Sequence, residues 1–172
     1  MEGESVLNNP AAKGAIQIGV AEWKAAKDPG ILRTTLGSCV AAVLYSPELK
    51  AGGISHILLG EAPQGRIVNR GKYARTSVFA LLEDLKKMEV PPEKLKARIF
   101  GGASMFNAKN SPFLQRIGEE NISSVKKVLD ELKIEIIHED TGGHSGRHLI
   151  FYLDDGRIFY SANGKEKYIY KV

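Results

Sequence analysis

Cysteine is almost missing from this sequence: among 172 residues, only Cys39 carries a thiol. A single thiol cannot form an internal disulfide, which excludes the disulfide-stapled class of secreted domains. The N-terminus also lacks the basic stretch, the apolar stretch and the small-residue cleavage site of a secretory signal. We therefore expect a protein of the reducing cytoplasm.

Long apolar runs and dense basic blocks are missing as well. The longest apolar run covers about six residues, 39–44, whereas a helix needs about 20 to span a bilayer. The 24 Lys and Arg residues are interleaved with 20 Asp and Glu residues, for a formal net charge of +4. We expect neither membrane insertion nor nucleic-acid binding.

The sequence does contain enough apolar residues for a sizeable core. Its composition is 43% hydrophobic and 26% charged, which is typical of a globular protein, and its length suits one domain. Residues 1–14 have little periodic apolar character and are predicted to form a flexible N-terminal tail. Residues 15–172 are predicted to form the single domain.

Alternating and helical patterns predict the order of the secondary structure. Apolar residues at helical spacing predict one helix over 72–88 and a second helix after Gly118. The remaining patterns predict strands, listed as 15–23, 31–37, 39–45, 54–59, 95–102, 134–140 and three short strands from Arg147, with Asp155-Gly156 and Asn163-Gly164 as two-residue turns. This order indicates an α+β fold: a sheet-rich, mainly antiparallel, β-sandwich-like core with two main flanking helices.

Cys39 has two interpretations, an inert core residue or a catalytic nucleophile. A nucleophilic thiol needs a base or a cation beside it, and the nearest histidine in the sequence is His56. If Pro47 and Glu48 are the centre of the turn, Cys39 and His56 lie directly opposite each other on adjacent strands. A loop two residues longer makes them diagonal neighbours on one face, whereas a loop one residue longer separates them.

The residues before Cys39 fit a catalytic site. Gly37 and Ser38 permit a sharp bend whose amide N–H groups could hold an oxyanion. The hydroxyls of Thr34 and Thr35 could orient the imidazole. Against this stands the fact that an unpaired cysteine is commonly buried as a small apolar residue.

The other histidines and the glycine-rich segments carry weaker signals. His144 and His148 are four residues apart, but the segment is broken by glycines, and with His138 they lack a second cysteine, so no metal is expected. GGAS at 101–104 and TGGHSG at 141–146 match neither common phosphate-loop motif. We expect them to make turns that line the substrate cleft.

Several segments together resemble one known family. The cysteine segment TLGSCVAAVLY, the histidine segment GGISHILL, GKYARTSVFALLEDLKKM, RIFGGASMF and EDTGGHSGRHLIFYLDDGRI are similar, in this order, to the CheD family of chemoreceptor glutamine deamidases. The resemblance covers the chain from about residue 15 to its end. It departs from the family pattern at His144, where a small polar residue is expected.

The resemblance implies a cysteine hydrolase that converts glutamines of methyl-accepting chemotaxis receptors to glutamates without a cofactor or a metal. It implies Cys39 as the nucleophile, as a thiolate beside imidazolium His56, with a threonine upstream placed at Thr34 and Thr35 as the alternative. It further implies a fold similar to the catalytic domain of the cytotoxic necrotizing factor toxins.

The resemblance also implies partners. Receptor cytoplasmic helices are the expected substrate, and family members bind the phosphatase CheC in organisms that have it. Two alternatives follow: an adaptor whose main task is to bind receptors and CheC, and a cysteine amidohydrolase or transglutaminase that acts on other protein glutamines.

Overall fold

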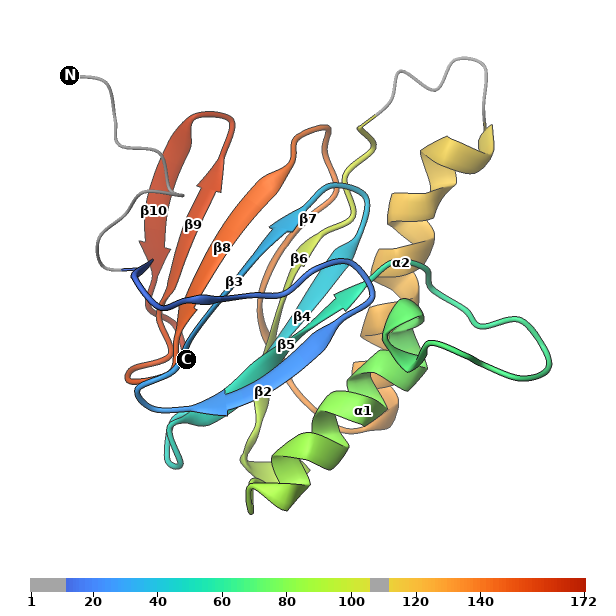
Figure 1. The fold of residues 1–172 in the computed structure, drawn as a ribbon. Helices are drawn as coiled ribbons and strands as arrows, with labels where there is room; N and C mark the ends of the chain where they lie inside the picture. The colour runs from blue at the N-terminus through green and yellow to red at the C-terminus, as the bar shows by residue number, and fades with distance from the viewer. Residues whose placement is uncertain (1–11, 106–111) are drawn as a thin grey trace.

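A computed structural model describes residues 12–105 and 112–172 of the chain. Two five-stranded sheets face each other, and two main helices cover the outer face of one of them (Figure 1). The α+β prediction with two main helices is therefore confirmed. Most of the predicted tail, residues 1–11, lies outside the described residues, while Ala12 is buried against the outer face of the first sheet.

The first sheet has the strand order β1-β3-β8-β9-β10. Its strands are β1 (Ile16–Gln17), β3 (Ile31–Leu36), β8 (Arg147–Tyr152), β9 (Ile158–Ala162) and β10 (Lys165–Ile169). β1 and β3 are parallel, and the other neighbours are antiparallel. The sheet is therefore mixed.

The second sheet has the strand order β2-β5-β4-β6-β7. Its strands are β2 (Trp23–Lys27), β4 (Val40–Ser46), β5 (Ala51–Ile57), β6 (Lys96–Gly101) and β7 (Ile136–Thr141). Here β6 and β7 form the parallel pair. β4 and β5 are buried along their whole length, because this sheet has a packed layer on each side.

Two hydrophobic clusters fill the two spaces beside the second sheet. On β4, Val40 and Ala42 face the helices, whereas Ala41 and Val43 face the first sheet. This alternation follows from the period of two in a strand. The cluster between the two sheets, called here the inter-sheet core, also contains Cys39.

The helices are α1 (Ala74–Lys87) and α2 (Pro112–Glu131), with short 3-10 turns η3 (Arg70–Lys72) and η4 (Pro92–Lys94). α1 lies close to its predicted span. α2 begins before Gly118, which was predicted to precede it. Among the described residues, no helix is long and apolar enough to cross a membrane.

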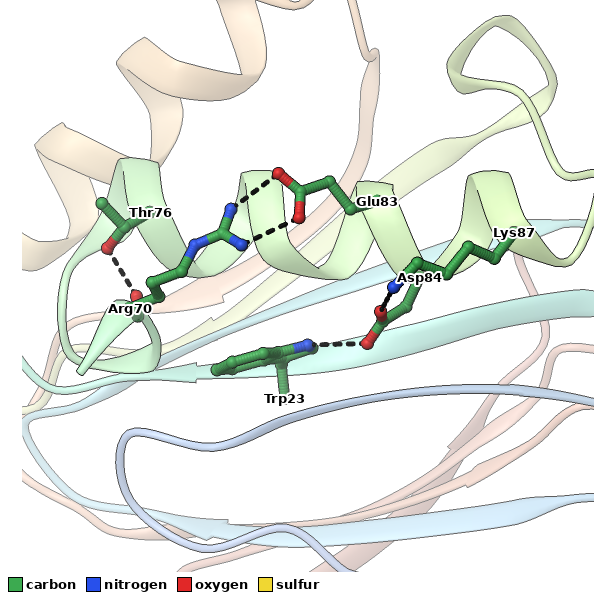
Figure 2. Close-up of polar contacts among 6 residues, drawn as sticks. All are labelled: Trp23, Arg70, Thr76, Glu83, Asp84 and Lys87. Atoms are coloured by element: carbon green, nitrogen blue, oxygen red, sulfur yellow. Dashed lines mark hydrogen bonds and ion pairs between the residues drawn. The ribbon is translucent and has the colours of Figure 1, made fainter. Parts of the chain in front are cut away.

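Polar contacts tie α1 to the sheet and to η3 (Figure 2). The indole Nε1–H of Trp23 on β2 donates to Asp84 at 2.9 Å. Arg70 in η3 makes two hydrogen bonds of 2.8 Å to Glu83, and Thr76 donates to the Arg70 carbonyl. These contacts fix the register of α1 over β2 and β5.

Two of the strand and turn predictions need correction, and one connection was not predicted. The predicted strand over 15–23 contains only β1 and the first residue of β2, which belong to different sheets. β3 and β4 likewise belong to different sheets, so the bend at residues 37–39 carries the chain from one sheet to the other. The predicted two-residue turn at Asn163-Gly164 is confirmed. The predicted two-residue turn at Asp155-Gly156 is wrong: these residues lie in a longer connection between β8 and β9, in which Tyr152 N–H donates to the Arg157 carbonyl and Gly156 N–H donates to the Tyr152 carbonyl.

Candidate active site

The β4–β5 hairpin places Cys39 and His56 on the same face of the second sheet. Ser46 pairs with Ala51 and Ala41 with His56, so the loop holds four residues, 47–50. Continued by one residue, this register sets Cys39 opposite Leu58 and diagonal to His56. The prediction that Cys39 and His56 lie directly opposite each other is therefore wrong. The structure has the alternative register, with a loop two residues longer.

His56 is held by a threonine from the opposite sheet. The distance from Thr34 Oγ1 to His56 Nδ1 is 2.8 Å, and Thr34 Oγ1 also donates to the Ile18 carbonyl at 2.8 Å. Because the hydroxyl has one proton and gives it to Ile18, it accepts from Nδ1–H of His56. In the neutral ring, which burial favours, Nε2 then carries no proton. Thr34 is therefore the threonine that contacts the candidate base.

This hydrogen-bond chain leaves Nε2 of His56 as the nitrogen with a free lone pair. His56 is only 2% exposed, and its buried Nε2 has no hydrogen-bond partner among the described residues, the Cys39 thiol included. Hydrogen bonds between catalytic groups are commonly long or unformed before a substrate binds. The ring is thus oriented to accept a proton at Nε2.

Thr35, the alternative to Thr34, faces the other way. Its Oγ1 lies 2.9 Å from Nδ1 of His148, its neighbour on β8, in an exposed pair on the outer face of the first sheet. The two threonines point to opposite faces because they are adjacent in a strand. The structure does not bring Thr35 to Cys39 or His56.

Burial favours the neutral forms of both candidate catalytic groups. Burial raises the pKa of the Cys39 thiol, and its own backbone amide partly offsets this. Burial lowers the pKa of His56, against smaller opposing effects of the Ile18 carbonyl and the Glu22 carboxylate. The thiolate–imidazolium pair expected from the sequence is therefore disfavoured in the free protein, since neither charge is solvated there.

The bend before Cys39 is held by backbone hydrogen bonds to the glycine turn after β6. Gly102 N–H donates to the Cys39 carbonyl at 2.8 Å, and Ala103 N–H donates to the Gly37 carbonyl at 3.1 Å. A side chain at Gly101 would place its Cβ 2.2 Å from the Cys39 carbonyl oxygen, so only glycine allows this approach.

The carbonyl between these two is also held. Asn121 of α2 donates from Nδ2 to the Ser38 carbonyl at 3.0 Å. By contrast, no amide N–H of residues 37–39 bonds to another residue within the described ranges. Gly37 and Ser38 therefore lie in a bend with fixed carbonyls and available amide donors.

The two glycine-rich loops meet beside this bend. Ser104 N–H donates to the Gly143 carbonyl and Gly142 N–H to the Gly101 carbonyl, while Arg147 braces the second loop through Asp140 and the Gly142 carbonyl. Residues of both loops line a pocket of about 180 Å³ together with Glu119. Met105, 47% exposed, packs near Gly37 and Gly146.

The remaining histidines do not form a cluster. His138 packs against Phe100, His144 bonds to the Ser104 carbonyl, and His148 bonds to Thr35. No group of three or more His, Cys, Asp or Glu side chains in the described part of the chain could hold a metal ion.

The sequence analysis missed Asn121 and the Ile18 carbonyl. Asn121 did leave a signal: it occupies a position in the apolar stripe of α2 that includes Ile122 and Val125, where a polar side chain needs a buried partner. The Ile18 carbonyl left none, because its role depends on how β1 and β3 pair.

Comparison with known proteins supports this reading of the chain. The sequence profile described as CheD chemotactic sensory transduction matches residues 58–162. The chain is 41% identical over 154 residues to the probable chemoreceptor glutamine deamidase CheD of Caldanaerobacter subterraneus subsp. tengcongensis, covering 87% of this chain and 93% of that one. It is 40% identical over 142 residues to the chemoreceptor glutamine deamidase CheD of Thermotoga maritima, covering 82% and 87%.

The profile match begins after His56, but the pairwise alignments reach further. An alignment that covers 87% of 172 residues leaves out about 22, so it spans Thr34, Cys39 and His56. Since the profile covers more than half of the chain and the relatives align over most of it, the resemblance seen in the sequence is confirmed. The chain belongs to the CheD family of chemotactic sensory transduction proteins.

Proposed function

We propose that this protein is a chemoreceptor glutamine deamidase that hydrolyses glutamine side chains of methyl-accepting chemotaxis receptors to glutamates, acting on their helices in the cytoplasm. The observation that carries the proposal is the Thr34–His56 hydrogen bond, which engages Nδ1 and leaves the buried Nε2 without a partner among the described residues, on the hairpin face that also carries Cys39. The curated relatives named as chemoreceptor glutamine deamidases supply the substrate class.

The reaction begins with neutral groups. As the Cys39 sulfur attacks the glutamine carboxamide carbon, Nε2 of His56 removes the thiol proton, and Thr34 holds the opposite side of the ring. The carbonyl oxygen becomes an oxyanion, which the amide N–H groups of the bend at residues 37–39 would stabilise. One such donor typically lowers a barrier by about 2.7–4 kcal/mol.

Collapse of the tetrahedral intermediate releases ammonia. The imidazolium of His56 gives its proton to the leaving nitrogen, and a thioester between Cys39 and the substrate acyl group remains. Neutral His56 then takes a proton from water, whose oxygen attacks the thioester and yields glutamate and the free thiol. The cycle consumes one water and needs no external oxidant, reductant or cofactor.

Limited access to the thiol fits this substrate. Cys39 is 7% exposed and lies at the end of the bend, beside the glycine turn after β6. A glutamine carboxamide at the end of a flexible chain can enter where a backbone amide cannot. This favours a side-chain deamidase over a peptidase.

The test is conversion of glutamine to glutamate in a purified receptor cytoplasmic fragment, followed by mass spectrometry. Cys39→Ala should fold and lose all conversion. Thr34→Val should lower the rate by roughly 10- to 100-fold, because His56 loses the acceptor that sets its tautomer. Thr35→Val, the matched control on the same strand, should keep the wild-type rate.

Full activity in Cys39→Ala would end the proposal, as would equal losses in the two threonine variants. Conversion of glutamines in unrelated proteins at the same rate would point to a broader cysteine amidohydrolase or transglutaminase. Receptor binding without conversion, together with binding of CheC, would make the protein an adaptor. A similarity to the catalytic domain of the cytotoxic necrotizing factor toxins remains part of the proposal, because the same thiol and imidazole chemistry would suit both.

A further inference from the structure

Asn121 is the only buried polar side chain of α2 among its described residues, and it makes two hydrogen bonds outside the helix. The side chain is 1% exposed, and Nδ2 donates to the Ser38 carbonyl and to the Leu58 carbonyl, each at 3.0 Å. Both acceptors are carbonyl oxygens, so the amide orientation is fixed and both Nδ2 protons are used.

The two carbonyls lie at the ends of the strands that carry the site. Ser38 directly precedes Cys39, and Leu58 follows His56 by two residues. The last pair of the β4–β5 ladder is Val40 with Ile57. Asn121 therefore bridges the two strands just beyond the point where their ladder ends.

Fixing the Ser38 carbonyl also fixes the Cys39 amide. The peptide between them is planar and trans, so its N–H points away from its C=O. The carbonyl points to α2, on the helix side of the second sheet, and the N–H therefore points away from α2. The Cys39 thiol packs on that other side, in the inter-sheet core, and its own amide is close enough to lower the thiol pKa.

We propose that Asn121 is a positioning residue that holds the Cys39 amide N–H as an oxyanion donor for the deamidation. The inference rests on the proposed function. It assigns to α2, which contributes no group to the chemistry, the task of aiming a backbone dipole at the place where negative charge develops.

The neighbouring carbonyls show why this peptide depends on Asn121. The Gly37 and Cys39 carbonyls are held by Ala103 and Gly102, whereas the one donor to the Ser38 carbonyl within residues 12–105 and 112–172 is Asn121. Without this donor the Ser38–Cys39 peptide can rotate between its two anchored neighbours.

The simpler reading is that Asn121 only packs α2 against the sheet, and the experiment separates the two. Asn121→Asp keeps the shape but supplies at most one donor in either protonation state. Val125→Ala is the matched control. Val125 is fully buried one turn along the same face of α2, so its truncation loosens the packing of α2 against the sheet without removing a hydrogen bond. Each variant is assayed for deamidation of the receptor fragment and for alkylation of Cys39 by iodoacetamide, a displacement that forms no oxyanion.

If the proposal holds, kcat of Asn121→Asp falls roughly 10- to 100-fold. Its KM should stay within about twofold of wild type, and so should its alkylation rate when measured at a pH where the thiol is ionised in every variant, because neither then depends on an oxyanion donor. Val125→Ala should keep kcat within about twofold. Asn121→Ser, which also cannot bridge both carbonyls, replaces Asn121→Asp in the same assays if the carboxyl prevents folding.

Three results would overturn the inference: an unchanged kcat, a parallel loss of alkylation and deamidation, or an equal loss in Val125→Ala. Failure of the proposed function looks different. In that case wild-type protein does not convert receptor glutamine, or Cys39→Ala still does, whatever Asn121 contributes.

Discussion

At the scale of single residues, the candidate site combines a buried thiol with a buried imidazole, and burial disfavours the charged form of each. Burial raises one pKa and lowers the other, so the two shifts move the titrations apart. In the proposed function we expect such a pair to react by general-base attack, in which the proton leaves sulfur as the bond to carbon forms. A preformed thiolate, as in many reactive cysteines, is not required.

This arrangement predicts a broad pH plateau for kcat/KM. His56 must be neutral to act as the base, and a lowered pKa keeps it neutral to lower pH, so the acidic limb should fall below the range in which a free imidazole titrates. The Cys39 thiol must be protonated to supply a proton to the leaving ammonia, and a raised pKa moves the alkaline limb above the range of a free thiol. Deamidation rates measured across pH give both limbs.

Alkylation of Cys39 across the same pH range is the companion measurement. The rate should rise only at alkaline pH in wild type and in His56→Ala alike. A rapid reaction in acid that disappears in His56→Ala would reveal the ion pair and contradict this account.

The sequence placed Cys39 and His56 on one face of a hairpin but left their register open. Cys39 and His56 could be paired because both flank one turn, and the alternatives for loop length included the register found. The choice between Thr34 and Thr35 could not be made, because it depends on which face of β3 meets the hairpin of the other sheet. Only tertiary packing decides that.

At the scale of elements, α2 touches the site at a second point besides Asn121. Gly118 lies against the glycine turn after β6, where a Cβ would stand 2.3 Å from the Gly102 carbonyl oxygen and 3.2 Å from that of Ala103. The same Gly102 donates its N–H to the Cys39 carbonyl. The helix thus packs directly against the turn that holds Cys39.

Gly118→Ala should therefore destabilise the protein although alanine is the better helix former. The gain in helix propensity is about 1 kcal/mol, whereas overlap with backbone atoms that cannot rotate away costs about 1–3 kcal/mol. A net loss of about 1 kcal/mol is expected from urea unfolding. Ser123→Ala, on the exposed side of the same helix, should change stability by no more than about 0.5 kcal/mol; equal or greater stability of Gly118→Ala would refute the contact.

Helix spans were easier to predict than strand partners. The spacing of Val78, Leu81 and Leu85 predicted α1, because the buried face of a helix appears in the sequence as apolar residues three and four positions apart. The start of α2 was missed because Gly118 was taken as a boundary, whereas it is a contact point inside the helix. Gly37 and Ser38 indicated a bend between β3 and β4, but no local pattern shows that the chain changes sheet there.

At the scale of the whole molecule, the second sheet is shared by two cores. β4 contributes Val40 and Ala42 to the cluster under the helices, and Ala41 and Val43 to the inter-sheet core. Neither core can be removed without exposing one face of the same strands. Sharing one sheet between two cores is a physical reason to expect a single domain. Its bounds, residues 15–172, stay a prediction.

Two natural probes can test this cooperativity, because the chain has one tryptophan and one cysteine. Trp23 packs beside the cluster under the helices, and Cys39 lies in the inter-sheet core. Urea unfolding followed by Trp23 fluorescence and by labelling of the Cys39 thiol should give the same midpoint. Labelling that begins at clearly lower urea would show that the two sheets separate before the helices do.

Adjacent threonines of β3 each bind a histidine, one on the inner and one on the outer face of the first sheet. An inserted or deleted residue within that strand would exchange the two and leave the imidazole of His56 facing a different side chain. Evolutionary changes in length between residue 31 and the nucleophile must therefore fall in the bend, not in the strand. In an alignment of this segment, gaps should be placed in the bend at residues 37–39, even where residue identity would place them within β3.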